Sequence, residues 1–455
     1  MSTTHALVNP ATEEQFATVE VRGLDETNQA IETAARVAPA WRRVAPVDRA
    51  RLLRRFADVV DSHLEELARL EVANAGHTIA NARWEAGNVR DVLLYYSGAP
   101  ERHAGRQIPV AGGVDLTFYE PLGVVGIIVP WNFPMPIAAW GVAPALAAGN
   151  TVVLKPALLT PLTAQRLGEL ALEAGLPEGV LQVVIGDGTV VGERFVTHPA
   201  VRKVCFTGSN AVGRTIMRGC AEQIKRVTLE LGGKSANIVF ADADLAKAAA
   251  AAPYAVFDNA GQDCCARSRL LVEASAYDRF MELFETAVRG VRVLDPADEA
   301  SEMGPLISAA QRESVSAYVD ESTVAFRGDA PDGPGYWMAP TVLETPDTTA
   351  RAFHDEIFGP VVSVVRFRDE DEAVAVANES PYGLSGSIWS RDVGRALRVA
   401  RAVETGALSV NSNSSVRYST PFGGFKQSGL GRELGPDALL GFSEEKNVFI
   451  ATEDY

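Results

Sequence analysis

Cys264 follows a short polar stretch that contains a glycine, Asn259–Asp263. A cysteine in such a turn is a candidate nucleophile, because the thiolate is the reactive form and a turn can expose it to a substrate. Taken alone, a free cysteine is more often a small buried hydrophobic side chain. A catalytic role for Cys264 therefore depends on partners elsewhere in the chain.

Two further polar side chains follow segments that are typical of buried strands. Glu230 precedes Gly232 and Gly233, and a carboxylate at such a strand end is either paired structurally or held for proton transfer. Asn132 lies in Pro130–Pro134 (PWNFP), where its amide could donate to a developing oxyanion or could satisfy a local turn. Both positions suit a site at the carboxyl ends of strands.

Two glycine-rich segments could contact ligands. Gly208–Gly213 joins a predicted strand to a predicted helix, so the first amides of that helix could bind a phosphate, although the full dinucleotide-binding glycine fingerprint is absent. Pro421–Glu433 is dense in glycine and indicates a tightly packed irregular loop. A structural and a functional role are equally compatible with this second segment.

The elements that must position these residues alternate along the chain. The uncharged run Leu122–Leu154 is long enough to span a bilayer, but four prolines interrupt it. We therefore predict a buried strand at Leu122–Val129, a helix at Ile137–Ala148 and a second strand at Thr151–Lys155. Further strands are expected at Gly179–Ile185, Val201–Phe206, Arg226–Leu231 and Ser235–Phe240. This alternation indicates a doubly wound α/β fold with a parallel sheet.

The rest of the chain extends this pattern. Residues 25–105 carry apolar positions at helical spacing, and Gln107–Val110 with Val114–Tyr119 predicts a β-hairpin. Strands and helices alternate again to about Val410, and Lys446–Thr452 is typical of a final strand. No linker of serine and glycine marks a domain boundary.

Composition limits the classes of function. The 455 residues, 47% hydrophobic and 22% charged, suit a globular protein of two to four domains. A net charge of −16 argues against general binding to nucleic acid or an anionic membrane. Four cysteines, two of them adjacent, and no signal-peptide pattern indicate a reducing, cytoplasmic location. Six scattered histidines predict no metal site.

Together the motifs are far more specific than any one of them. From about Val8 to its end, the chain resembles the aldehyde dehydrogenase superfamily. The matching segments, in order, are Pro130–Pro134, Lys155-Pro156, Phe206–Ser209, Glu230–Lys234, Asn259–Cys264, Glu356–Pro360 and Pro421–Glu433.

The resemblance implies a Rossmann-type cofactor domain, an α/β catalytic domain and a small β element for oligomerisation. The cofactor domain would comprise residues 1–106 and 121–231, and the catalytic domain 232–415. The oligomerisation element would comprise 107–120 and 437–455, and 416–436 would return to the interface of cofactor and substrate. A homodimer or a homotetramer is expected.

The resemblance also implies the chemistry. Cys264 would attack the aldehyde as a thiolate, and the resulting thiohemiacetal would lose hydride to a nicotinamide. Asn132 and the Cys264 backbone N–H would stabilise the oxyanion. Glu230 would then activate the water that hydrolyses the thioester. Glu433 matches a second glutamate that is sometimes placed on a proton path.

Family resemblance assigns the cofactor contacts as well. Lys155 matches the ligand of the adenosine ribose, Glu356 matches the ligand of the nicotinamide ribose, and Phe358 would pack nearby. The remaining cofactor residues by this resemblance are Trp131, Gly208, Ser209, Gly213 and Leu231. NAD is expected, but Leu158 stands where many NAD-using relatives carry a glutamate, so use of NADP stays open.

Four residues are candidates for contact with a small aldehyde substrate. Phe133, Trp140 and Phe422 match positions that line the family's substrate tunnel, and such aromatic walls suit unbranched aliphatic or aromatic aldehydes. Asp263, next to the nucleophile, either forms a local hydrogen bond or places a negative charge at the substrate, which would favour cationic aminoaldehydes or raise the pKa of Cys264.

Several alternatives remain beside this interpretation. Cys265 is expected to be structural. Arg417 lies near the tunnel wall, but no arginine pair suits a carboxylate substrate, so semialdehydes rank lower. An acylating enzyme that uses coenzyme A is disfavoured, because such relatives usually lack the glutamate found at Glu230. Intact Cys264, Glu230 and Asn132 argue against a non-enzymatic protein that merely retains the fold.

Overall fold

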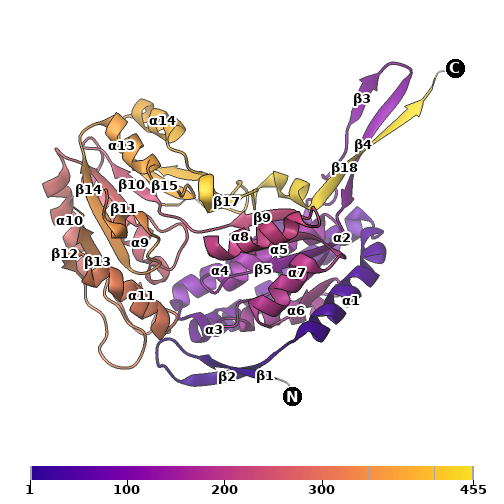
Figure 1. Ribbon diagram of the computed structural model, residues 1–455, viewed down its shortest axis with the longest axis horizontal. Helices are drawn as coiled ribbons and strands as arrows, with labels where there is room; N and C mark the ends of the chain where they lie inside the picture. Colours follow the sequence, from indigo (N-terminus) through magenta and orange to yellow (C-terminus); the bar gives the residue numbers. More distant parts are fainter. Residues whose placement is uncertain (1–2, 346–347, 415, 453–455) are drawn as a thin grey trace.

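The computed structural model describes residues 3–345, 348–414 and 416–452, so the expected element at 437–455 is described only to residue 452. Two lobes lie side by side, each built on its own β-sheet, and an arm of three strands projects from one of them (Figure 1). The alternation of strands and helices expected from the sequence is confirmed in both lobes. None of the described helices is both long and apolar enough to cross a membrane.

The first sheet has six strands in the order β17-β9-β8-β5-β6-β7. Its parallel strands are β5 (Val124–Ile128), β6 (Thr151–Lys155), β7 (Leu181–Val183), β8 (Val201–Thr207) and β9 (Arg226–Glu230). Strand β7 is shorter than the expected Gly179–Ile185. At the other edge, β17 (Gly429–Leu430) pairs antiparallel with β9 and so returns the C-terminal region to this sheet.

Helices cover both faces of this sheet, because successive side chains of a strand point to opposite sides. Val125 and Ile127 of β5 pack with one set of helices, and Val124 and Ile128 pack with the other. The first set is α2 (Pro46–Ser62), α3 (Leu64–Ala75), α4 (Ile79–Ser97), α5 (Pro134–Ala147) and α6 (Leu162–Glu173). The second set is α1 (Leu24–Arg42), α7 (Glu193–Thr197) and α8 (Asn210–Ala221), with the π-helical turn η1 (Gly188–Gly192) before α7.

The second sheet has seven strands in the order β12-β13-β14-β11-β10-β15-β16, and all pair in parallel except β12. They are β10 (Ala236–Val239), β11 (Arg269–Glu273), β12 (Thr323–Arg327), β13 (Thr341–Glu344), β14 (Val361–Phe367), β15 (Ser385–Trp389) and β16 (Ala407–Val410). The helices around it are α9 (Leu245–Phe257), α10 (Tyr277–Arg289), α11 (Ala309–Asp320), α12 (Arg351–His354), α13 (Glu370–Asn378) and α14 (Val393–Ala402).

Two antiparallel elements complete the chain. The arm joins the expected hairpin, β3 (Gln107–Val110) and β4 (Gly113–Pro121), to β18 (Ser443–Ala451), which pairs with β4 along its whole length. An N-terminal hairpin of β1 (Thr3–Val8) and β2 (Gln15–Val21) was not expected from the sequence. Each of its strands buries only one side chain, Leu7 or Val19, so the apolar alternation that marks a strand is weak there.

Candidate active site

The loop that carries Cys264 is a tight turn between the end of α9 and β11. Asn259 and Ala260 adopt left-handed backbone conformations with φ of 50° and 52°. Gly261 follows at φ 70°, and a Cβ there would lie 2.0 Å from the Gly359 carbonyl oxygen, so only glycine fits. This packing against the Glu356–Pro360 segment holds the nucleophile loop in one conformation.

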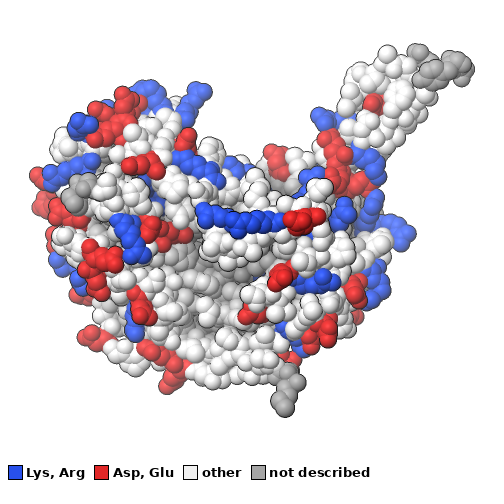
Figure 2. All heavy atoms as spheres, in the orientation of Figure 1, with Lys and Arg blue, Asp and Glu red and all other residues white. Residues whose placement is uncertain are grey.

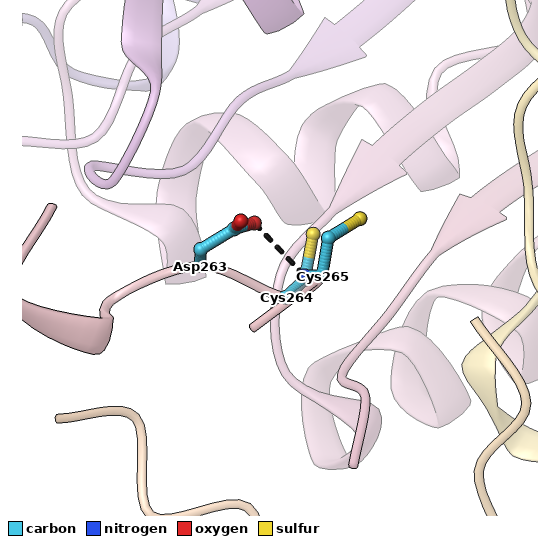
Figure 3. A group of neighbouring side chains, drawn as sticks. All are labelled: Asp263, Cys264 and Cys265. Atoms are coloured by element: carbon cyan, nitrogen blue, oxygen red, sulfur yellow. Dashed lines mark hydrogen bonds between the residues drawn. The ribbon is translucent and has the colours of Figure 1, made fainter. Parts of the chain in front are cut away.

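The side chains of Asp263, Cys264 and Cys265 lie together at the end of this loop (Figure 3). The Cys265 backbone N–H donates to the Asp263 carboxylate at 2.8 Å, which is the local hydrogen bond expected for Asp263. The neighbouring Cys265 thiol, burial and the Asp263 carboxylate all raise the pKa of the Cys264 thiol. The resting state is therefore a thiol, and its reaction requires a base.

Asn132 is buried and tied to the same loop. Its Nδ2 donates to the Gln262 carbonyl oxygen at 3.0 Å, while Asn259 Nδ2 donates to the Asn132 carbonyl oxygen at 2.8 Å. The Gln262 side chain donates back to the Asn259 carbonyl oxygen at 3.1 Å. Because an amide nitrogen carries two hydrogens, Asn132 keeps one donor for another acceptor. Sequence reasoning did not assign these positioning roles to Asn259 and Gln262.

Glu230 is the last residue of β9 and is only 3% exposed. Neither of its carboxyl oxygens has a hydrogen-bond partner among the described residues. Burial, followed by the nearby Glu433 carboxylate, raises the pKa of Glu230 well above its ordinary value. Burial likewise raises the pKa of Glu433 to about 7. Because the negative charges of two neighbouring buried carboxylates repel each other, Glu230 and Glu433 do not ionise together readily.

A cavity of about 260 Å³ opens onto the Cys264 thiol. The four expected substrate residues, Phe133, Trp140, Asp263 and Phe422, all line it. The rings of Trp140 and Phe422 meet edge to face at 5.4 Å, and the Trp140 indole N–H donates to Asn88 Oδ1 at 2.9 Å. These contacts fix the aromatic walls in place.

Among the lining residues that sequence reasoning missed are four aromatic or charged ones: Trp84, Tyr254, Asp258 and Arg267. Asp258 stands one residue before the Asn259–Cys264 motif, which was the one available signal for it. Trp84 and Tyr254 lie on helices α4 and α9, whose apolar pattern does not distinguish a cavity from a core. The exposed Arg417 does not line the cavity.

A second cavity, of about 230 Å³, is also lined by Cys264. Trp131, Gly208, Ser209, Leu231, Glu356 and Phe358 line it, as expected for cofactor residues. Lys155 and Gly213 do not. The Lys155 ammonium donates to the Pro156 carbonyl oxygen at 2.9 Å, and Gly213 packs so closely under Leu231 that a Cβ would lie 2.6 Å from that side chain.

The lining of this second cavity suits the nicotinamide and phosphate portions of a dinucleotide. Helix α8 begins beside it after Ser209 and supplies N–H groups suited to a phosphate. Gly232 leaves room for the Glu356 carboxylate, since a Cβ there would lie 2.1 Å from Glu356 Oε2. Trp131 and Phe358 meet edge to face at 5.3 Å and provide flat apolar walls.

The two cavities meet at three shared residues, Thr207, Glu230 and Cys264. A ligand in either cavity therefore reaches the same thiol and the same carboxyl group. This arrangement suits a reaction in which a carbonyl carbon bonded to Cys264 exchanges hydride with a cofactor on one side and meets water on the other.

A separate buried cluster of Glu71, His77 and Glu85 lies behind the oxyanion turn. His77 Nδ1 and Glu85 Oε1 are 2.5 Å apart, and the His77 ring lies 5.5 Å from the Phe133 ring. One ligand atom from each of the three side chains lies within 4.8 Å of the others, and Asp263, Cys264 and Cys265 form a second such group. Both groups are close enough to hold a metal ion, and the absence of a metal stays a prediction.

Comparison with known proteins agrees with this geometry. Residues 1–448 match the aldehyde dehydrogenase family. An aldehyde dehydrogenase of Emericella nidulans is 39% identical over 454 residues, covering 98% of this chain and 91% of the relative. A phenylacetaldehyde dehydrogenase of Pseudomonas fluorescens is 41% identical over 460 residues, covering 97% of this chain and 92% of the relative.

Among solved structures, the betaine aldehyde dehydrogenase of Staphylococcus aureus in complex with NAD+ superposes with a TM-score of 0.96. It is 36% identical and covers 100% of this chain and 92% of its own. Both the sequence motifs and the backbone therefore lead to one conclusion: the chain belongs to the aldehyde dehydrogenase family and is an NAD-dependent oxidoreductase that acts on aldehydes.

Proposed function

We propose that this chain oxidises its aldehyde by covalent catalysis at Cys264, with Glu230 as the general base and Asn132 as an oxyanion donor. The observation that carries the proposal is that Cys264 and Glu230 line both cavities. A bound aldehyde and a bound cofactor would thus approach the same sulfur from opposite sides.

The first step forms a C–S bond and requires removal of the thiol proton. Because the pKa of Cys264 is raised, the ionised form of Glu230 is the base that accepts this proton. The sulfur then adds to the aldehyde carbon, and the carbonyl oxygen gains the negative charge. Asn132 Nδ2 and the Cys264 backbone N–H donate to that oxygen, each for about 3–4 kcal/mol. NAD, when bound, supplies the hydride acceptor.

The second step hydrolyses the thioester on Cys264. Glu230 accepts a proton from water, the water oxygen adds to the thioester carbon, and the C–S bond breaks to give a carboxylic acid and the free thiol. Glu433, whose carboxyl shares the buried environment of Glu230, relays the proton away from it. If Glu230 activates water in this way, the acyl group is released by hydrolysis. This disfavours the acylating alternative, in which coenzyme A would accept the acyl group.

For the cofactor, we infer that Glu356 binds the nicotinamide ribose, Phe358 packs against the ring, and Ser209 with Gly208 faces the pyrophosphate. Trp131 and Leu231 complete the walls. Lys155 does not line this cavity and would instead bind the adenosine ribose outside it. Gly213 would support the turn at Gly208 and Ser209 from below Leu231. The pKa of Lys155 is lowered to about 8 by burial, and a bound anionic group would raise this pKa again.

At larger scale we infer a cofactor domain of residues 1–106 and 121–231, a catalytic domain of 232–415, and a segment 416–436 that bridges them. The arm, 107–120 with 437–455, would assemble a homodimer or homotetramer. Its support is an apolar exposed surface on Ile108, Val110, Phe118, Phe449 and Ile450, and few charged side chains on the face of the arm seen in Figure 2. All four cysteines are free, which suits the cytoplasm.

The proposed function is tested by following reduced cofactor with a panel that includes phenylacetaldehyde, betaine aldehyde and hydroxyisobutyraldehyde, the substrates named for relatives. Each is assayed with and without coenzyme A. Formation of the free acid without coenzyme A is expected. Strict dependence on coenzyme A, or reduction of the cofactor by the Cys264→Ala variant, would contradict the proposed mechanism.

A further inference from the structure

We propose that the substrate cavity selects aldehydes that carry a positive charge, held by Asp258 and Asp263 among the aromatic walls. This inference rests on the proposed function of the Cys264 site and specifies its substrate class. Both carboxylates line the cavity that opens onto the thiol, one in the nucleophile loop and one just before it.

Asp258 is held with its carboxylate in a defined position. The Asn81 side chain donates to Asp258 Oδ1, and the Tyr254 hydroxyl is hydrogen-bonded to the same carboxylate. Tyr254 and Trp84 are 66% and 55% exposed, so they stand at the entrance of the cavity. A cationic group that enters would meet two aromatic rings and a carboxylate first.

Asp263 provides the deeper charge. It is bonded to the Cys265 backbone N–H and lies beside Cys264, so a cation bound there is adjacent to the reacting carbon. Phe133, Trp140 and Phe422 surround the same space. The faces of such rings attract quaternary ammonium groups, and this attraction is stronger once water has been displaced from the site.

The charges of the lining do not cancel. Burial and the Glu433 carboxylate raise the pKa of Glu230 well above its ordinary value, whereas burial raises the pKa of Asp258 only to about 6, which leaves Asp258 ionised at neutral pH and above. Burial also raises the pKa of Asp263, and the hydrogen bond from the Cys265 N–H and the charge of Arg267 oppose that rise. Among the described residues of the lining, Arg267 carries the guanidinium, and it is engaged in the protein. It donates to the Cys265 and Asn413 carbonyl oxygens at 2.8 and 2.9 Å and to Ser387 Oγ at 3.2 Å.

The positive charge of Arg267 thus offsets the negative charge of at most one of the two aspartates. A neutral substrate would bury the other carboxylate and give it no positive partner. Burying an unpaired charge is costly, so the cavity discriminates against a neutral group of the same shape. The same aromatic walls in a cavity without these carboxylates would accept neutral aryl aldehydes equally well.

The test compares isosteres. Trimethylammonioacetaldehyde and 3,3-dimethylbutanal differ only in a charged nitrogen against a carbon, and kcat/KM is measured for both. The ratio of cation to neutral is then determined for Asp263→Asn, Asp258→Asn and the control Asp278→Asn, whose side chain is 95% exposed on α10. Because hydration of each aldehyde is the same in every variant, it cancels when these ratios are compared.

We expect the ratio to fall about tenfold or more in at least one of the two cavity variants and to stay constant in the control; tenfold corresponds to about 1.4 kcal/mol. A binding readout repeats the comparison with the unreactive alcohols choline and 3,3-dimethylbutan-1-ol as competitive inhibitors. Choline should inhibit more strongly, and less so in the aspartate variants.

The inference is overturned if the neutral aldehyde and alcohol equal the cations, or if both cavity variants retain the wild-type ratio. Failure of the proposed function has a different signature, since neither aldehyde would then reduce the cofactor. Choline binding, measured by calorimetry on the wild-type protein, would still decide the charge preference in that case.

Discussion

Asn132 Nδ2 donates a hydrogen bond to the Gln262 carbonyl oxygen, 3.0 Å away, and this contact links the turn before α5 to the loop that carries Cys264. The donor and the nucleophile come from different lobes, 132 positions apart in the chain. Their relative position therefore depends on the packing of one lobe on the other rather than on local sequence.

Replacement of Asn132 by alanine should lower kcat by about 10²–10³, the usual effect of removing one oxyanion donor. KM should change much less, because the neutral carbonyl gains little from the same hydrogen bond. Steady-state kinetics check this, and thermal unfolding of the variant controls for damage to the loop. An equal loss in kcat for Asn88→Ala, which removes only a wall contact, would argue against a specific role.

The adjacent cysteines should behave differently. Cys264→Ala is expected to abolish aldehyde oxidation, whereas Cys265→Ala should keep most of it, since Cys265 is only 4% exposed and packs in the core. The Cys265 thiol is also the largest cause of the raised pKa of Cys264. The alkylation of Cys264 by iodoacetamide, followed against pH, should therefore have its midpoint at lower pH in Cys265→Ala. An unchanged midpoint would refute this coupling.

Glu230→Gln should slow turnover far more than it weakens aldehyde binding, because hydrolysis of the thioester requires the carboxylate. Mass spectrometry should detect an accumulating acyl-enzyme. The pKa of Glu230 is raised, so the group becomes protonated and inactive as the pH falls, and wild-type kcat should decline on the acidic side. That acidic limb should be absent in Glu230→Gln; its persistence would assign it to another group.

The cofactor choice can be tested at Leu158. This side chain packs against Ile185 and the N-terminal hairpin and places no negative charge near Lys155. We expect NAD to be used with measurable NADP activity, and Leu158→Glu to reduce the NADP-to-NAD ratio of kcat/KM about tenfold, or about 1.4 kcal/mol, by repelling the 2′-phosphate. Leu158→Gln is the matched uncharged control. If the ratio does not fall with glutamate, Leu158 does not lie at the ribose.

Removal of the residues after Asn447 should yield smaller or insoluble species. The deletion takes away the pairs that join Val448–Ala451 to β4 and exposes that strand edge. Size-exclusion chromatography with light scattering would measure the assembly. A soluble oligomer of unchanged mass would show that the arm is dispensable for assembly.

Much of this fold follows from the sequence alone. Residues 124–128 and 152–154 are uninterrupted apolar runs, because a parallel strand covered by helices on both faces has no polar side. Glycines that cannot carry a Cβ, such as Gly261 and Gly233, mark the places where one backbone segment must approach another. These local requirements are why the order of elements could be predicted, whereas the expected cavity residues came from the resemblance to the family.

Tertiary structure decided what local patterns do not contain. Asp258 and Tyr254 line a cavity because the end of α9 meets α4, where Asn81 donates to Asp258, and nothing in their own segment distinguishes a cavity from a protein surface. Lys155 and Gly213 belong to matching motifs but do not line the second cavity, because Lys155 donates to the Pro156 carbonyl oxygen and Gly213 packs under Leu231. Packing therefore determines which residues of a motif face a cavity. The raised pKa of Glu230 likewise arises from tertiary structure: burial is its largest cause, and the next is Glu433, which follows β17 and lies 203 positions later in the chain.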